Sequence, residues 1–167
     1  MNVLGIETSC DETAVAVVKD GREILSSRVS SSLHLHRKYG GVIPEIASRR
    51  QLETITAVAE CALQGAGVSL KDIGLCSVTE GPGLPGSLLV GLSFARALSL
   101  ARQIPCLGAN HIHSHIYANF LTPQGRRIKF PFVALVVSGG HTSLFWVKDF
   151  PAAGNRPHSG RRLRRGL

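Results

Sequence analysis

The sequence is poor in the features that mark exported, disulfide-linked and membrane-spanning proteins. Its 167 residues include four cysteines, with no CxxC pair or close spacing among them: Cys10, Cys61, Cys76 and Cys106. This pattern excludes a zinc knuckle and a disulfide framework, and it fits a reducing compartment. The first residues lack the basic and apolar regions of a signal peptide, and no uninterrupted apolar run reaches the ~18 residues that cross a bilayer. We therefore expect a soluble cytoplasmic protein with no membrane partner.

Acidic residues are scarce as well. Eleven of them stand against nineteen lysines and arginines, which gives a formal net charge of +8. Such a balance is typical of proteins that bind nucleic acid. The excess is uneven, however, because residues 151–167 contain five arginines and no acidic residue, so that residues 1–150 carry a net charge of +3. Most of the basic character therefore belongs to the last 17 residues.

Apolar residues make up 44% of the chain, enough for a packed core, and their spacing changes along the sequence. Alternation predicts three antiparallel strands at the start, followed by strands and helices in turn. This order indicates an α/β fold built on a mixed sheet. The predicted strands are 2–9, 13–18, 23–30, 73–79 and 104–109, and the predicted helices are 44–65, 87–103 and 111–120.

Three further segments carry specific expectations. Residues 30–41 are polar and rich in turn formers, which predicts a flexible loop. The helix over 87–103 is apolar on most faces, which predicts that it is buried. After a polar linker at 122–129, two apolar runs at 132–137 and 143–148 repeat the layout of the first hairpin. The repetition suggests a duplicated domain whose second copy has just begun.

The segment from Asn110 to His115 holds three histidines at alternate positions. On a helix, His111 and His115 lie on one face with Cβ atoms ~6 Å apart, so both imidazoles can bind one metal ion. A catalytic metal usually takes three protein ligands, so the third must come from elsewhere. The alternative is a polar helix start with capping histidines, because i,i+4 pairs often arise by chance. His113 points roughly opposite and is expected to face solvent or a partner.

Two turns of small residues follow apolar strands, at Glu7-Thr8-Ser9 and at residues 138–142. Their backbone amides, hydroxyls and glycines suit a phosphate group, and together they resemble a phosphate-binding cleft between two lobes. The alternative for each is an ordinary hairpin turn. A third loop, GPGLPGS at 81–87, lies where ligands gather in α/β folds, although it matches no phosphate-binding motif and a purely conformational role fits equally well.

Five segments in the same order resemble the tRNA adenosine threonylcarbamoyltransferase family, formerly labelled O-sialoglycoprotein endopeptidase, of the actin-like ATPase superfamily. They are GIETSCDETAVAVV (5–18), YGGVIPEIASRRQLE (39–53), GPGLPGSLLVGLSFARAL (81–98), NHIHSHIYA (110–118) and FPFVALVVSGGHTSL (130–144). The resemblance implies an actin-like α/β fold. It implies a complete first lobe over 1–125, with a mixed sheet and flanking helices, and the first β-hairpin of a second lobe over 126–150.

The resemblance also implies a metal-dependent acyltransferase. This enzyme would move a threonylcarbamoyl group from threonylcarbamoyl-adenylate to N6 of the adenosine beside the anticodon in tRNAs that read ANN codons. Its expected partners are tRNA, threonylcarbamoyl-adenylate and the proteins of the modification complex. Since the attacking nucleophile would be the exocyclic amine of the substrate, we assign no catalytic base.

The site residues implied by the resemblance fall into two groups. His111 and His115 would bind one divalent metal ion, iron or alternatively zinc, with a third carboxylate ligand far downstream. The adenylate would contact Val136, Val137, Ser138, Gly139 and Gly140. A metal can polarise the carbamoyl carbonyl while the glycine turn holds the phosphate. Many relatives carry Glu where this chain has His113.

The resemblance stops near residue 150, and the tail over 151–167 has no apolar period on which to fold. One choice of codons for residues 155–167, read one base later, spells TGPTRDDACGEAF, which fits the absent family segment. We therefore interpret the tail as a frameshift product or a disordered segment. The alternative is a basic arm for tRNA. Because the third metal ligand is absent, the activity of this chain by itself is left open.

Two other functional classes can be weighed against transfer to tRNA. A non-catalytic actin-like partner subunit of the same complex would characteristically lack the His111 and His115 pair. A metalloprotease would need a general-base glutamate beside these histidines, and the motif contains none.

Overall fold

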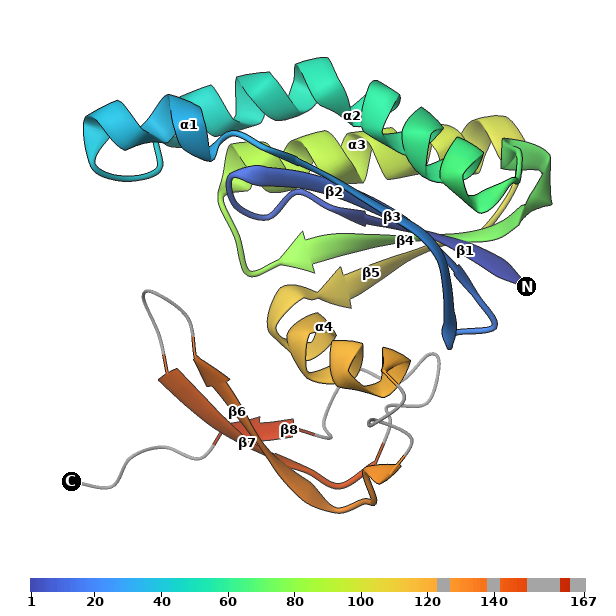
Figure 1. The fold of residues 1–167 in the computed structure, drawn as a ribbon, viewed down its shortest axis with the longest axis vertical. Coiled ribbons are helices and arrows are strands. Elements are labelled where there is room, and N and C mark those ends of the chain that lie inside the picture. The colour runs from blue at the N-terminus through green and yellow to red at the C-terminus, as the bar shows by residue number, and fades with distance from the viewer. Residues whose placement is uncertain (123–126, 138–141, 150–159, 163–167) are drawn as a thin grey trace. The chain divides into compact units, whose positions relative to one another are not determined.

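The structure is a computed structural model that describes residues 1–122, 127–137, 142–149 and 160–162 (Figure 1). The chain divides into two units, Met1–His111 and Ile112–Leu167, here called unit 1 and unit 2. The first lobe over 1–125 that the resemblance implies stays a prediction.

A five-stranded sheet in the order β3-β2-β1-β4-β5 forms the base of unit 1. Strands β1 (Asn2–Glu7), β2 (Glu12–Lys19) and β3 (Glu23–Ser31) are antiparallel, as the alternation predicted. Strands β4 (Ile73–Gly81) and β5 (Cys106–Asn110) instead run parallel to β1. This arrangement confirms the mixed sheet. It also brings the carboxyl ends of β1, β4 and β5 together along one side, here called the carboxyl edge (Glu7, Gly81 and Asn110).

Two long helices lie on the same face of this sheet (Figure 1). Helix α2 (Pro44–Ala66) begins with proline, whose fixed φ suits the first turn, and ends at Gly67, whose φ of +66° suits a left-handed cap. Helix α3 (Pro85–Arg102) also begins with proline, two residues before the predicted start. A short 3-10 helix, η2 (Leu70–Asp72), leads from α2 into β4. The amino-terminal ends of both long helices lie at the carboxyl edge (Figure 1).

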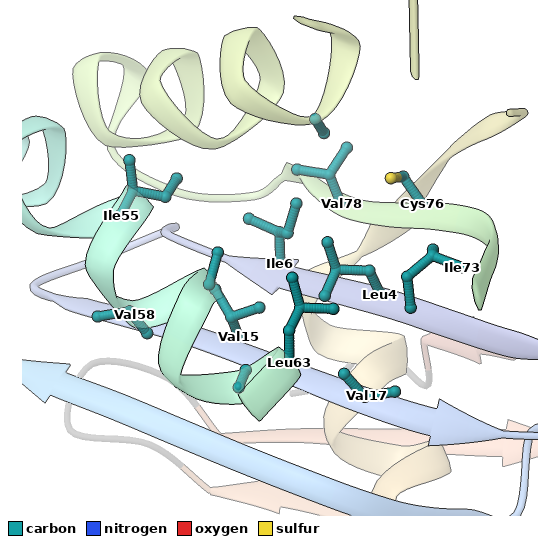
Figure 2. Close-up of a cluster of buried hydrophobic side chains, with 13 residues drawn as sticks. Leu4, Ile6, Val15, Val17, Ile55, Val58, Leu63, Ile73, Cys76 and Val78 are labelled. Atoms are coloured by element: carbon teal, nitrogen blue, oxygen red, sulfur yellow. The ribbon is translucent and has the colours of Figure 1, made fainter. Parts of the chain in front are cut away.

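The core of unit 1 lies between the sheet and these two helices (Figure 2). Alternate residues of β1 and β2 point into it, so that Leu4, Val15 and Val17 are fully buried. This alternation is what fixes the register of the strands, because a shift by one residue would turn the apolar set away from the helices. The remaining members are Ile6, Ile55, Val58, Ala59, Ala62, Leu63, Ile73, Cys76, Val78 and Ala95.

The prediction that the helix over 87–103 is buried was wrong. In α3 the buried residues are Ser87, Gly91 and Ala95, which are small and spaced by four. They seat the helix closely on the sheet, since a Cβ at Gly91 would collide with Thr8 Oγ1. Leucines on the other side are open to solvent, and Leu89 and Leu100 are 64% and 80% exposed. The prediction from apolar periodicity failed because the residues of α3 that pack against the sheet are small rather than strongly apolar.

The segment over 30–41 also differs from the predicted flexible loop. Its residues form a short helix, α1 (Leu33–His36), followed by a 3-10 turn, η1 (Arg37–Tyr39), which Gly40 ends at a φ of +70°. Ser32 and His36 are 2% exposed and hydrogen-bonded to each other, so polar side chains hold the segment in place. Some of the polar residues that led to the prediction of a loop are instead buried and make these hydrogen bonds.

Unit 2 is built on a three-stranded sheet in the order β6-β7-β8. Strands β6 (Phe132–Val137) and β7 (Thr142–Val147) form the predicted hairpin. Ile116, Phe145 and Val147 are its buried residues, and Phe120, Phe130 and Phe132 stack around them at 5.3–5.8 Å between ring centroids. Helix α4 (His111–Tyr117) continues as the 3-10 helix η3 (Ala118–Leu121), over the segment expected to be helical to residue 120.

The tail contributes a strand where no folded structure was expected. Strand β8 (Gly160–Arg162) pairs antiparallel with β7, opposite Phe145, Trp146 and Val147. Backbone hydrogen bonds to the open edge of a hairpin need no apolar periodicity, which is why the sequence pattern gave no sign of this strand. Within the described ranges, none of the helices combines the length and apolar character needed to cross a membrane.

The core of unit 1 gives a first prediction. Replacing Leu4 by Ala removes a fully buried side chain from the middle of the sheet, and should lower the free energy of unfolding by about 2–5 kcal/mol. Urea denaturation followed by circular dichroism measures this change. The matched control is Leu100→Ala on the outer side of α3, where 80% exposure predicts a change within about 0.5 kcal/mol. Equal losses in the two variants would contradict this assignment of the core.

Candidate functional site

The carboxyl edge of unit 1 carries a group of polar side chains from three strands. Glu7 is the last residue of β1, Thr79 lies near the end of β4, and His111 follows the last residue of β5. Parallel strands bring these three positions together although they are separated by up to 104 residues in the sequence. The helix α4 begins at His111, so this residue is fixed by both the sheet and the helix start.

The Glu7 carboxylate holds His111 by a direct hydrogen bond. Its Oε2 atom lies 3.1 Å from His111 Nδ1 and accepts a second hydrogen bond from the Thr79 hydroxyl at 2.5 Å. The other carboxylate oxygen, Oε1, accepts from the backbone N–H of Ser9. Ser9 Oγ also lies 3.0 Å from His111 Nδ1. The imidazole is therefore held on one side by a carboxylate that is itself fixed by two other donors.

The pKa of Glu7 reflects two opposed effects. Partial burial removes water from the carboxylate and raises the pKa, but hydrogen bonds from Ser9, Thr79 and His111 lower it by a larger amount. The result is a pKa below the ordinary value for glutamate, so Glu7 is ionised at neutral pH. An ionised carboxylate can only accept hydrogen bonds, and His111 Nδ1 must be the donor.

This hydrogen bond selects one tautomer of His111. With the proton on Nδ1, the lone pair of the neutral ring is on Nε2, which is the arrangement found when histidine binds a metal through Nε2 and a carboxylate holds the other nitrogen. His115 lies one helical turn further along α4 and is exposed. The prediction that both residues lie on one helix is confirmed. Over the residues that the structure describes, no three side chains of His, Cys, Asp or Glu are grouped to hold a metal ion.

The turn between β1 and β2, residues 8–11, and the first residue of β2 are held by the buried side chain of Gln51 on α2. Its Nε2 donates to the carbonyl oxygens of Thr8, Cys10 and Glu12, at 3.3, 3.0 and 3.0 Å. Gln51 is 1% exposed, and its hydrogen bond to Thr8 is buried, while those to Cys10 and Glu12 are partly buried. The turn carries Ser9, and Gln51 thereby fixes the position of a direct neighbour of His111.

The hydroxyls of this turn do not face an open phosphate site. Thr8 is fully buried and donates to the carbonyl oxygen of Ser87, while Ser9 is 2% exposed and contacts His111. The prediction that these two hydroxyls bind phosphate is therefore wrong. Composition alone could not reveal it, because an exposed hairpin turn and a buried one use the same small residues.

The glycine-rich loop over 81–87 packs directly against the same turn. The N–H of Leu84 donates to the carbonyl oxygen of Ser9 at 2.7 Å, and a Cβ at Gly83 would lie 2.5 Å from that oxygen. Gly83 is thus required by a close backbone approach. Of the two readings that the sequence allowed for this loop, the structure favours the conformational one.

The remaining candidate residues lie in unit 2. His113, expected to face solvent or a partner, is half-buried and packs edge-on against Phe145 at 6.3 Å between ring centroids; burial lowers its pKa. The solvent-facing prediction for His113 was therefore wrong. Val136 is half-buried beside the aromatic cluster, and Val137, the last residue of β6, is 67% exposed. Ser138, Gly139 and Gly140 lie outside the described residues.

Sequence reasoning missed the roles of Glu7, Thr79 and Gln51. The signal for Glu7 and Thr79 was their position, because both are polar residues at the carboxyl ends of predicted strands, where His111 also lies. Only the order of the strands in the sheet pairs them. Gln51 gave no signal, since a glutamine on an amphipathic helix is ordinarily a surface residue.

The hydrogen bonds of Glu7 give a prediction about pH. The folded-state pKa of Glu7 is depressed, so its contribution to stability is present at neutral pH and is lost as the pH falls below about 4.5 through that lower pKa. We expect Glu7→Gln to lower the free energy of unfolding at about pH 7 by about 1–2 kcal/mol. The difference from the unaltered chain should shrink in acid. Urea denaturation of both forms, from about pH 7 to below about pH 4.5, measures the loss of stability and its change with pH. A difference between the two forms that does not change with pH would exclude an ionised Glu7.

Comparisons with known proteins agree with the sequence resemblance. The sequence model of the family described as tRNA N6-adenosine threonylcarbamoyltransferase matches residues 23–156. Curated relatives with this name include those from Caldicellulosiruptor saccharolyticus (58% identical over 150 residues), Geotalea uraniireducens (60% over 148) and Bacillus subtilis (56% over 149). The matches cover 90%, 89% and 89% of this chain and 44%, 42% and 42% of the relatives. The chain thus spans less than half the length of these relatives.

Among solved structures, YeaZ from Pseudomonas aeruginosa superposes with a TM-score of 0.55 at 17% sequence identity, over 98% of this chain and 64% of that chain. This likeness concerns the fold, and it bears out the actin-like α/β class expected from the sequence. The family match, in contrast, is a match of sequence. It extends over most of this chain and includes Thr79, His111 and His115. The chain belongs to the tRNA N6-adenosine threonylcarbamoyltransferase family.

Proposed function

We propose that this chain carries part of the machinery of a tRNA-modifying transferase. The reaction moves a threonylcarbamoyl group from threonylcarbamoyl-adenylate to N6 of the adenosine beside the anticodon, in tRNAs that read ANN codons. The observation that carries the proposal is the high identity to relatives named for this activity, 58% over 150 residues in one case. The contact between Glu7 and His111 supports it, since it prepares an imidazole for binding at the carboxyl edge, where ligands bind in α/β folds.

His111 and His115 would hold the divalent metal ion of this enzyme, with iron as the expected ion and zinc as the alternative. The fit rests on the Glu7 hydrogen bond, which fixes the His111 tautomer, and on the one-turn spacing along α4. A bound divalent ion would act as a Lewis acid toward the carbamoyl carbonyl. Glu7, Thr79 and Ser9 would keep the ring of His111 in one orientation.

The adenylate would contact Val136 and Val137 at the end of β6, with Ser138, Gly139 and Gly140 after them. Val137 is exposed at the last position of its strand. The nucleophile is the exocyclic amine of the adenosine, and the protein's part is to place the two substrates. Partner proteins of the modification complex and a cytoplasmic location belong to the same proposal.

The hydrogen bonds of Glu7 argue against the metalloprotease alternative. A zinc protease needs a glutamate that takes a proton from water, whereas Glu7 accepts hydrogen bonds from Ser9, Thr79 and His111. Its depressed pKa also makes it a weak base. The partner-subunit alternative is less economical, because it leaves His111 and its carboxylate without a role.

Transfer of the threonylcarbamoyl group to tRNA tests the proposal directly. The chain to be assayed joins residues 1–150 to the remaining part of the Bacillus subtilis relative, which is 56% identical over the shared region. With labelled threonylcarbamoyl-adenylate, unmodified tRNA and the partner proteins, we expect transfer, and His111→Ala should reduce it at least about 100-fold. Leu52→Ala, on the exposed side of α2, is the control and should leave transfer unchanged.

Three results would change the assignment. Full transfer by the His111→Ala form would remove this residue from the metal site. If neither the unaltered chain nor any variant transfers the group, but the chain still binds the partner proteins, the non-catalytic subunit would be favoured. Cleavage of a protein substrate that depends on His111 would favour the metalloprotease.

A further inference from the structure

The segment Leu33–Gly40 displays cations and an aromatic ring on the surface of unit 1. Arg37, Lys38 and Tyr39 follow one another in η1 and are exposed, Tyr39 by 52%. Lys38 Nζ lies 4.9 Å from the centroid of the Tyr39 ring, so the ammonium group and the ring are presented together. This combination of basic side chains and an open aromatic face is the one that proteins use to bind unpaired RNA.

Buried hydrogen bonds hold this segment rigidly. The N–H of Ile43 donates to His36 Nδ1 at 3.2 Å, so His36 Nε2 carries the proton and donates to Ser32 Oγ at 3.1 Å. Ser32 Oγ in turn donates to the carbonyl oxygen of Asp11. His36 is 2% exposed, and this chain of hydrogen bonds has one direction throughout. Arg37, Lys38 and Tyr39 are therefore displayed by a fixed support.

The local charge is positive, and half of it is uncompensated. Residues 32–53 contain four lysines and arginines and two acidic residues. Arg49 and Arg50 pair with Glu45 and Glu53 on α2. Within the part of the chain that the structure describes, Arg37 and Lys38 form no ion pair with a carboxylate. The amino-terminal end of α2 lies just beyond them and adds a partial positive charge.

This segment is continuous with the Glu7 and His111 site through a single turn. Asp11, which accepts the hydrogen bond of Ser32, belongs to the turn over 8–11. Ser9, on the other side of that turn, contacts His111. The residue that holds the basic segment and the residue that contacts the imidazole thus belong to one backbone turn. An RNA bound to the segment would have its neighbouring nucleotides at the carboxyl edge.

We propose that residues 33–40 bind the anticodon loop of the tRNA substrate. Arg37 and Lys38 contact phosphates on the strand next to the target adenosine, and Tyr39 stacks on an unpaired base. His36 is a positioning residue that holds the segment against the turn. The inference rests on the proposed function, which supplies tRNA as the substrate, and adds the surface that receives it.

Binding of a short RNA hairpin tests this assignment. The probe is a fluorescently labelled anticodon stem-loop with unmodified adenosine, and anisotropy is measured with the 167-residue chain from about 50 to 200 mM salt. The double variant Arg37→Ala/Lys38→Ala should lower affinity about tenfold or more, and reduce the slope of log K against log salt by about 1.4. Tyr39→Ala should lower affinity about tenfold with an unchanged slope, and should not affect a fully paired RNA of equal length.

The matched control removes two positive charges from the end of the sheet opposite the carboxyl edge. Lys19→Ala/Arg22→Ala alters the exposed connection between β2 and β3, and should leave both affinity and slope near those of the unaltered chain. A third variant replaces Arg161, Arg162, Arg164 and Arg165 by Ala. All the substituted side chains of the segment are exposed, and circular dichroism confirms that each variant folds.

The outcomes separate this inference from the proposed function. If the chain binds the hairpin and the Arg37/Lys38 variant behaves like the control, the inference is overturned while tRNA binding stands. If binding is lost only when the four tail arginines are replaced, the tail is the RNA contact and the inference is again overturned. If the unaltered chain does not bind the hairpin at all, both the surface and the tRNA substrate are rejected for this chain.

Discussion

The arrangement of unit 1 depends on how the turn between β1 and β2 is held. Three carbonyl oxygens, those of Thr8, Cys10 and Glu12, lie within 3.3 Å of one buried amide nitrogen, Gln51 Nε2. Buried carbonyls without donors are costly, so the N–H groups of this single side chain from α2 stabilise the turn where it is buried, at Thr8. The glycine-rich loop packs on one side of the turn, and Ser32 binds the other. His111 reaches its carboxylate beside the same turn.

Much of this fold could be predicted from the sequence, because β1 and β2 alternate clearly and α2 has an apolar stripe bounded by Pro44 and Gly67. The order of strands, and hence the contact of Glu7 with His111, could not be read in this way. Pairing between residues about a hundred positions apart is decided by the whole sheet and leaves no local pattern. Buried polar residues such as His36 and Gln51 were missed for a related reason, since their partners are mostly backbone atoms, and these do not vary with sequence.

The site also shows how a family resemblance and local physics contribute different things. The resemblance implies the histidines and the reaction, while the hydrogen bonds of Glu7 explain why one tautomer of His111 is held. The depressed pKa of Glu7 is the link between the two, because it keeps the carboxylate an acceptor at neutral pH. A neutral glutamic acid at this position could leave His111 in either tautomer.

The separation of Glu7 from His111 has a consequence for how the protein is made. Glu7 leaves the ribosome with the first strand, whereas His111 follows the last strand of the sheet, so the pair forms only when β4 and β5 have both been added beside β1. A nascent chain that is incomplete in this region holds a carboxylate and no imidazole beside it. The oriented His111 imidazole thus arises only when β1, β4 and β5 are all in place, because its carboxylate partner lies at the end of the first of these strands.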